Sequence, residues 1–179
     1  MERIRCLDRC KLLSPLQHKA IAAICAGYVF HFFTEKIPEN SWILEEAIAS
    51  CWETIQGNIV VGYEQKLILL HDAVPDSETE SIGAALPAGE AIIAAYETAQ
   101  TGDGCYNAVQ AAYAAVHMNE FMMQRRSDGP PQALPGASVQ AFHAVIALSQ
   151  PVQDYVDFVD RALSTLEQGL APILLRSHK

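Results

Sequence analysis

His71 and Asp72 are candidate metal ligands, because an imidazole and a carboxylate in adjacent residues can bind a divalent metal ion. A metal-dependent hydrolase would need further ligands, and His18 or His31 upstream and Asp103 downstream are available. Nothing in the sequence around those three residues supports the choice. A solvated imidazole at a helix end is therefore the preferred interpretation of His71, and the hydrolase is kept as an alternative function.

Two other pairs have metal-ligand spacing. Cys6 and Cys10 are four residues apart, as in half of a zinc site or a redox pair, but no second Cys or His pair at such spacing follows. His117 and Glu120 are three apart, in the reverse order to the Glu-x-x-His of di-iron bundles and without a second copy. We therefore predict no metal site and no cofactor.

Signatures of the common catalytic sites are missing from the sequence. It contains no G-x-S-x-G nucleophile motif, no phosphate-binding glycine loop and no dinucleotide fingerprint. Its glycines stand where turns are expected. The sequence therefore predicts a non-catalytic protein.

Acidic residues carry the clearest functional signal. Between Ile37 and Glu120 there are thirteen Asp and Glu residues and one basic residue, Lys66, so this stretch has a net charge of −12, whereas the whole chain has −9. Because the stretch also has Ala, Ile and Leu at helical spacing, we expect the charge on a folded surface that attracts a basic protein partner. Nucleic acid is not expected as a partner, since phosphate binding needs clustered Lys and Arg.

A second acidic group lies near the end of the chain. Asp154, Asp157 and Asp160 follow one another at intervals of three, which places neighbours about 60° apart around a helix axis and forms a slanting stripe. With Val152 and Tyr155 turned to the core, the stripe must face water. We interpret it as a solvated face, and a partner-binding stripe is the main alternative.

Length and composition predict a single soluble domain, because 179 residues with 50% hydrophobic and 18% charged side chains are sufficient for one core. The five cysteines are scattered and odd in number, which favours a reducing, cytoplasmic location. The apolar stretch Ile21–Phe33 is shorter than the roughly 20 residues of a membrane span. We therefore expect no membrane association.

Capping and breaking residues predict the helices. Ser14-Pro15 starts a first helix that ends before Ile37-Pro38, and Asn40-Ser41 caps a second from Trp42 to Gln56. Further helices are expected at about 61–73, 81–101, 105–125, 139–148 and 150–168, with a Pro/Gly-rich loop at 127–138. Pro87 should either kink its helix or mark a break near Leu86. The fold class predicted is all-α, a single-domain bundle over 1–179 of six to eight helices with short loops. The residues expected to face the core are Ile43, Ala47, Ile48, Cys51, Trp52 and Ile55 in the second helix and Val152, Tyr155, Val159, Ala162, Leu163 and Leu166 in the last.

Four stretches carry a family resemblance: Leu16-Gln17-His18 before an apolar helix, the segment Ala47–Ile55, the run Leu70–Asp76, and the last helix from Gln150 through Phe158. Together they resemble the YjaG-like family of small, all-helical, functionally uncharacterised bacterial proteins. The sequence departs from the family pattern at His31–Thr34, and the segments 127–138 and 139–148 look like local additions. The resemblance implies an all-helical fold and brings no activity, cofactor or site residues.

These inferences favour a non-catalytic, acidic immunity or inhibitor protein that neutralises a basic toxin or effector by covering its active site. One alternative is the metal-dependent hydrolase that uses His71 and Asp72. Another is a self-associating regulatory module, a homodimer formed by the Ala-rich helices. The carboxylates expected to bind the partner are those of Glu45, Glu46, Glu53, Asp76, Glu78, Glu80, Asp154, Asp157 and Asp160.

Overall fold

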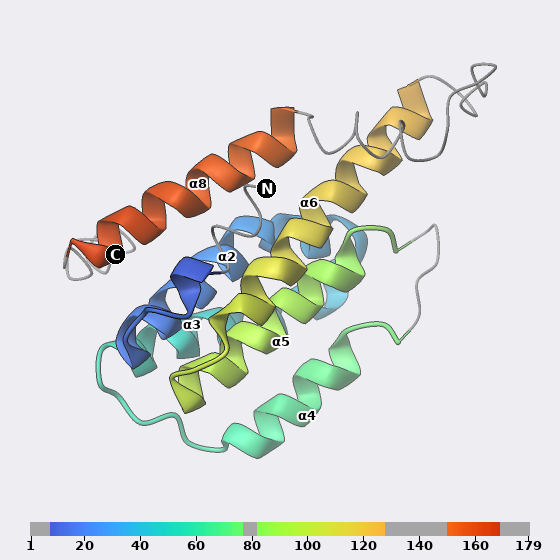
Figure 1. The fold of residues 1–179 in the computed structure, drawn as a ribbon. Coiled ribbons are helices and arrows are strands. Elements are labelled where there is room, and N and C mark those ends of the chain that lie inside the picture. Colours follow the sequence, from blue (N-terminus) through green and yellow to red (C-terminus); the bar gives the residue numbers. More distant parts are fainter. Residues whose placement is uncertain (1–7, 77–81, 128–149, 169–179) are drawn as a thin grey trace.

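Helices make up all the regular structure of the described residues, which are 8–76, 82–127 and 150–168 of the computed structural model (Figure 1). No strand occurs in these ranges, so the predicted all-α class is confirmed. The predicted loop at 127–138 and helix at 139–148 lie outside the described residues, apart from Ser127, which ends the helix that begins at Cys105. In chain order the elements are α2 (Pro15–Lys36), the 3-10 turn η1 (Pro38–Asn40), α3 (Ser41–Ile55), α4 (Tyr63–Ala73), α5 (Ala85–Thr101), α6 (Cys105–Ser127) and α8 (Gln150–Glu167).

The central layer consists of α2, α5 and α6, which pack against one another. The helix α3 packs on α2 and α5, α4 packs on α3 and α5, and α8 packs on α6 and α2. Figure 1 places α4 and α8 at opposite sides of the central layer. None of these described helices is long and apolar enough to cross a membrane.

Local chemistry sets both ends of α2, as predicted. The hydroxyl of Ser14 accepts the backbone N–H of Gln17 at 3.3 Å, and Oε1 of Gln17 accepts that of Ser14 at 2.8 Å. This capping box satisfies two N–H groups that no helix can satisfy internally, and Pro15 occupies the first helical position. At the other end the N–H of Ile37 donates to the carbonyl of Phe33 at 2.8 Å before a proline prevents further turns.

Small side chains allow the central helices to approach closely. The alanines at the α5 and α6 contact are almost completely removed from solvent, and this lets the two backbones pack at short range. The Ala-rich segments therefore fill the core of one chain, and the predicted homodimer through them gains no support. The fully buried alanines of these two helices are Ala85, Ala88, Ala91, Ala95, Ala108, Ala112 and Ala115.

Of the two alternatives predicted at Pro87, a kink or a break near Leu86, the structure has the break. The helix α5 begins at Ala85 rather than near Ser81, so Pro87 lies in its first turn. The N–H of Ala85 donates to the carbonyl of Ile82 in the preceding turn at 3.0 Å, and the N–H of Ala88 donates to the carbonyl of Ala84 at 3.1 Å. Proline has no N–H, but at this position a helix has no acceptor for one. Pro87 therefore helps to start α5 and does not interrupt it.

Two predictions near α4 also need correction. The helix begins at Tyr63 and not at Val61, because Gly62 adopts a left-handed backbone with φ of 74° that interrupts helical hydrogen bonding. The side chain of Asn40 does not cap α3. Its Nδ2 instead donates to the carbonyl of Ala73 at 3.2 Å, which ties the start of α3 to the end of α4.

The buried face of α8 is the predicted one, with all six expected residues removed from solvent. On α3 the prediction is partly wrong, because Leu44 is fully buried while Ile43, Ile48 and Trp52 are only half-buried. Ile43 and Leu44 are adjacent and about 100° apart around the axis. Either apolar side chain suits a core position, so the packing of α2 and α5 against α3 decides between them.

Candidate functional site

Glu45, Glu46 and Glu53 lie on the solvent side of α3, as predicted, while Leu44 and Cys51 face the core. All three carboxylates are exposed. Within the described residues none of them forms an ion pair. They provide solvated negative charge on one rigid helix.

A shallow groove of about 390 Å³ lies where the end of α4 meets α5. Apolar side chains from both helices line it together with three carboxylates and one imidazole, and no described lysine or arginine is among its lining residues. Negative charge above an apolar floor suits a positively charged segment that also has apolar side chains. The charged and apolar lining residues are His71, Asp76, Glu90, Glu97, Val74, Leu86 and Ile93.

Of the three partner-binding acids predicted in the turn that follows α4, only one can be placed. Asp76 is exposed at its edge, whereas Glu78 and Glu80 lie in 77–81, outside the described residues. Glu90 and Glu97 were missed by sequence reasoning. Their spacing of seven residues places them on one face of a helix, and this spacing could have identified them as a pair from the sequence.

The contact between α5 and the end of α4 depends on Gly89, since a Cβ there would lie 2.7 Å from both γ-carbons of Val74. We expect Gly89→Ala to displace Val74 and lower the free energy of unfolding by about 1–3 kcal/mol. Urea unfolding measures this change. Gly27→Ala is the matched control, because a Cβ at that helical position meets nothing within 4 Å and should stabilise α2 by about 1 kcal/mol. Equal stability of the two variants would contradict the close contact.

Asp160 does not belong to a uniformly solvated stripe, which corrects the sequence interpretation. The guanidinium of Arg9 donates to Oδ1 of Asp160 at 3.1 Å, to both carboxylate oxygens of Glu167 at 3.0 Å and to the hydroxyl of Ser164 at 3.1 Å. The hydrogen bonds from Arg9 hold the pKa of Glu167 below its usual value. A basic residue of the chain itself therefore neutralises part of the acidic face of α8.

The other two aspartates of α8 remain exposed. Asp157 accepts a hydrogen bond from Nε2 of Gln153 at 2.9 Å, one turn earlier in the helix. Asp154 is near enough to Tyr28 to contribute to raising the pKa of its phenol, after the larger effect of burial. The aspartates of α8 therefore interact more with neighbouring side chains than the glutamates of α3 do.

His71 and Asp72 are both exposed at the end of α4, and the nominated partners do not gather around them. His18 is buried, where its Nδ1 accepts the N–H of Cys105 at 3.4 Å, and His31 is exposed on α2. In the described part of the chain no group of three His, Cys, Asp or Glu residues is arranged to hold a metal ion. The hydrolase alternative gains no support.

Cys10 is brought against a thiol that its sequence spacing did not predict. The Cys105 thiol donates a hydrogen bond to the Cys10 sulfur and so lowers the pKa of Cys10, against the opposing effect of burial and with a smaller contribution from Arg9. The same bond and burial raise the pKa of Cys105. Both thiols are buried, and Cys6 lies outside the described residues. Burial raises the pKa of Cys51, which lies elsewhere in the core, to about 12.

We expect Cys105→Ala to raise the pKa of Cys10, because the thiol that stabilises its thiolate is then lost. The alkylation rate of Cys10 by iodoacetamide, followed against pH by peptide mass spectrometry, should shift to higher pH. Cys51→Ala serves as control, since that residue does not contribute to the shift. An unchanged profile of Cys10 in the Cys105→Ala protein would show that the two thiols do not interact.

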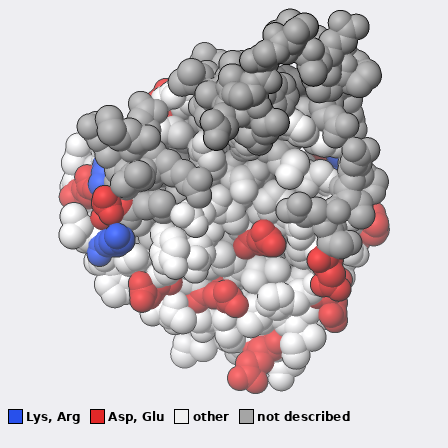
Figure 2. All heavy atoms as spheres, turned by 45° about the vertical axis from the view of Figure 1, so that its right-hand side comes forward, with Lys and Arg blue, Asp and Glu red and all other residues white. Residues whose placement is uncertain are grey.

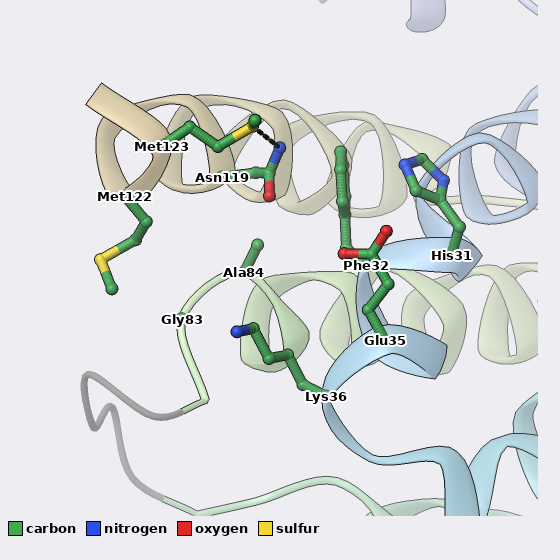
Figure 3. Close-up of a pocket in the computed structure, with 9 residues that line it drawn as sticks. All are labelled: His31, Phe32, Glu35, Lys36, Gly83, Ala84, Asn119, Met122 and Met123. Atoms are coloured by element: carbon green, nitrogen blue, oxygen red, sulfur yellow. Dashed lines mark hydrogen bonds between the residues drawn. The ribbon is translucent and has the colours of Figure 1, made fainter. Parts of the chain in front are cut away.

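A second hollow, of about 240 Å³, lies between the ends of α2 and α6 (Figure 3). Its charged groups have both signs, since Glu35 and Lys36 both line it. His31 and Met122 lie at opposite ends of the hollow and do not point toward a common centre. This arrangement favours no particular ligand.

Among the residues that the structure describes, the carboxylates of α3, α4 and α5 form no ion pair. The ion pairs of the described residues join Arg9 to Asp160 and to Glu167, and Lys11 to Asp8, so all involve residues near the two ends of the chain. Figure 2 shows acidic residues spread over the face that it draws, with far fewer basic ones. The negative charge of α3–α5 is therefore available to another molecule.

Comparison of the chain with protein-family models, with curated proteins and with solved structures finds no match. The resemblance to the YjaG-like family stays a prediction from the sequence.

Proposed function

We propose that this protein is a non-catalytic binding protein whose acidic α3–α5 surface covers a cationic surface of a basic protein, as an immunity or inhibitor protein covers the active site of a toxin. The observation that supports it is that exposed carboxylates of α3–α5 have no ion-pair partner within the described chain. Solvated charges of one sign on a rigid scaffold raise the association rate with an oppositely charged partner.

Two features favour the α3–α5 surface over α8 as the binding surface. The carboxylate of Asp160 on α8 is already bound by Arg9, so a basic partner would have to compete with an intramolecular ion pair. The groove between α4 and α5 also offers apolar area beside its carboxylates. Charge steers the encounter, but buried apolar contacts supply most of the affinity of protein interfaces.

The test is affinity capture of the tagged protein from an extract of its own cells at low and high salt. We expect one basic protein to be recovered in stoichiometric amount at low salt. Its binding should weaken at high salt, where screening shortens the range of charge interactions. An unrelated acidic protein of similar net charge, tagged in the same way, controls for nonspecific retention. If the tagged protein retains no protein that the control does not also retain, the proposal is wrong. The inhibitor role further requires that added protein blocks the activity of the recovered partner.

A further inference from the structure

A small hollow between α3 and α4 is also lined by Tyr96 of α5. Its walls include Trp42 and Glu46 from α3 and Lys66 and Leu69 from α4. The volume of about 20 Å³ has room for one water-sized group. The hollow lies inside the acidic α3–α5 surface.

The buried hydroxyl of Tyr96, a residue that lines this hollow, is unusual. Its side chain is 1% exposed, and the hydroxyl has no hydrogen-bond partner within the described residues. The ring stacks on Tyr63, with centroids 5.1 Å apart and planes 16° apart, so packing fixes its position. Buried hydroxyls are normally paired because leaving one unpaired is costly. Among the described residues, this hydroxyl is therefore an unpaired donor and acceptor just below the surface.

Large apolar side chains surround the mouth of the hollow. Trp42 is 59% exposed and Leu69 is 49% exposed, and their neighbour Ile68 on α4 is also exposed. Exposed tryptophan and leucine beside carboxylates have the composition of an interface anchor, in which aromatic residues contribute most of the binding energy. The carboxylate of Glu46 adds negative charge at the same place.

We propose that this hollow binds an arginine side chain of the basic partner. The inference rests on the proposed function and names the anchor within that interface. The guanidinium stacks on the Trp42 indole and donates to the Glu46 carboxylate, and one N–H reaches the Tyr96 hydroxyl in the water-sized space. Arginine suits all three contacts because it is planar, has five donors and stacks on aromatic faces.

Lys66 is the competing charge in the wall, and it forms no ion pair within the described residues. Its ammonium repels a guanidinium, so it limits the affinity for arginine. The alternative occupant would be an acidic side chain of the partner, bound by Lys66 and the Tyr96 hydroxyl. The exposed carboxylates around the hollow disfavour that occupant.

The test uses N-acetyl-arginine amide as the probe, with the lysine, norleucine and glutamate analogues for comparison. Two-dimensional ¹H–¹⁵N NMR of the full chain follows the titration. We expect saturable shifts at the Trp42 indole N–H and at the amides of Glu46 and Leu69, with arginine binding severalfold more tightly than lysine. Shifts caused equally by norleucine, or only by glutamate, would overturn the inference.

Variants then separate the contacts. Glu46→Gln and Tyr96→Phe should each weaken arginine binding about threefold to tenfold, and Lys66→Met should tighten it about twofold. Tyr96→Phe should leave the melting temperature unchanged or higher, because it removes an unpaired buried hydroxyl. Glu35→Gln on α2 makes the same charge change outside this hollow and serves as control.

The outcome separates this inference from the proposed function. If arginine shifts only residues of the α4–α5 groove, or if Glu46→Gln and Tyr96→Phe bind it as the native protein does, the anchor is wrong. A basic protein recovered by the capture experiment would still support the acidic binding surface in that case. If capture fails while arginine binds the hollow, the proposed partner class is wrong and the hollow remains an arginine-binding site.

Discussion

Reversing the charges of Glu45 and Glu46 together, by Glu45→Lys and Glu46→Lys, is expected to weaken binding of the basic partner on the order of a hundredfold at low salt. Each reversal replaces an attraction by a repulsion on the exposed side of α3. Binding should also lose most of its salt dependence, because that dependence arises from screened attraction between charges. Titration calorimetry with the captured partner at several salt concentrations measures both quantities.

The same charge change on the other acidic face gives the comparison. Asp154→Lys and Asp157→Lys also alter two exposed aspartates, but on α8, beyond the α3–α5 surface. We expect that double variant to change affinity only slightly, through the net charge of the protein. If the α8 variant loses binding and the α3 variant keeps it, the partner binds the face near Arg9 and the α3–α5 assignment is wrong.

Replacing Tyr155 with alanine is expected to lower the free energy of unfolding by about 3–5 kcal/mol. Its side chain is 1% exposed, and its ring contacts that of Tyr28 at a centroid distance of 5.3 Å. Its hydroxyl donates to the carbonyl of Val109 on α6 at 2.8 Å, so it links α8 to the central layer. The variant loses both the buried ring and this hydrogen bond.

Urea unfolding of three variants separates the contributions at this position. Tyr155→Phe keeps the ring and should lose only about 1 kcal/mol for the hydrogen bond. Asp157→Ala, on the exposed side of the same helix, should stay within about 0.5 kcal/mol of the native protein. A Tyr155→Ala protein as stable as the native one would mean that α8 does not pack on α6 as described.

Local sequence chemistry determined much of the fold. Ser14 and Pro15 define the start of α2, because a hydroxyl cap and a proline are favoured there whatever surrounds the helix. The apolar spacing in α8 predicted its buried face, since a helix covered from one side needs a single apolar stripe. The exposure of Glu45 and Glu46 on α3 followed from the same periodicity.

The sequence was a weaker guide where two local solutions were equally good. Pro87 suits either a kink or a first turn, and the observed start of α5 at Ala85 places it in the first turn. Asn40 suits an N-cap, but its side chain instead bonds to the carbonyl of Ala73, 33 residues away. Each choice depends on a distant group that no local pattern contains.

The tertiary structure alone decided which acidic side chains remain available and which residues form a site. Arg9 neutralises Asp160 across 151 positions of the chain, and Cys105 meets Cys10 from another helix. Tyr96 and Trp42 line the same hollow only because α5 packs against α3. Periodicity determines which side of a helix faces solvent, because it is a property of one helix. Pairing and burial of a particular group depend on what another helix brings to it, so they follow only from the packed arrangement.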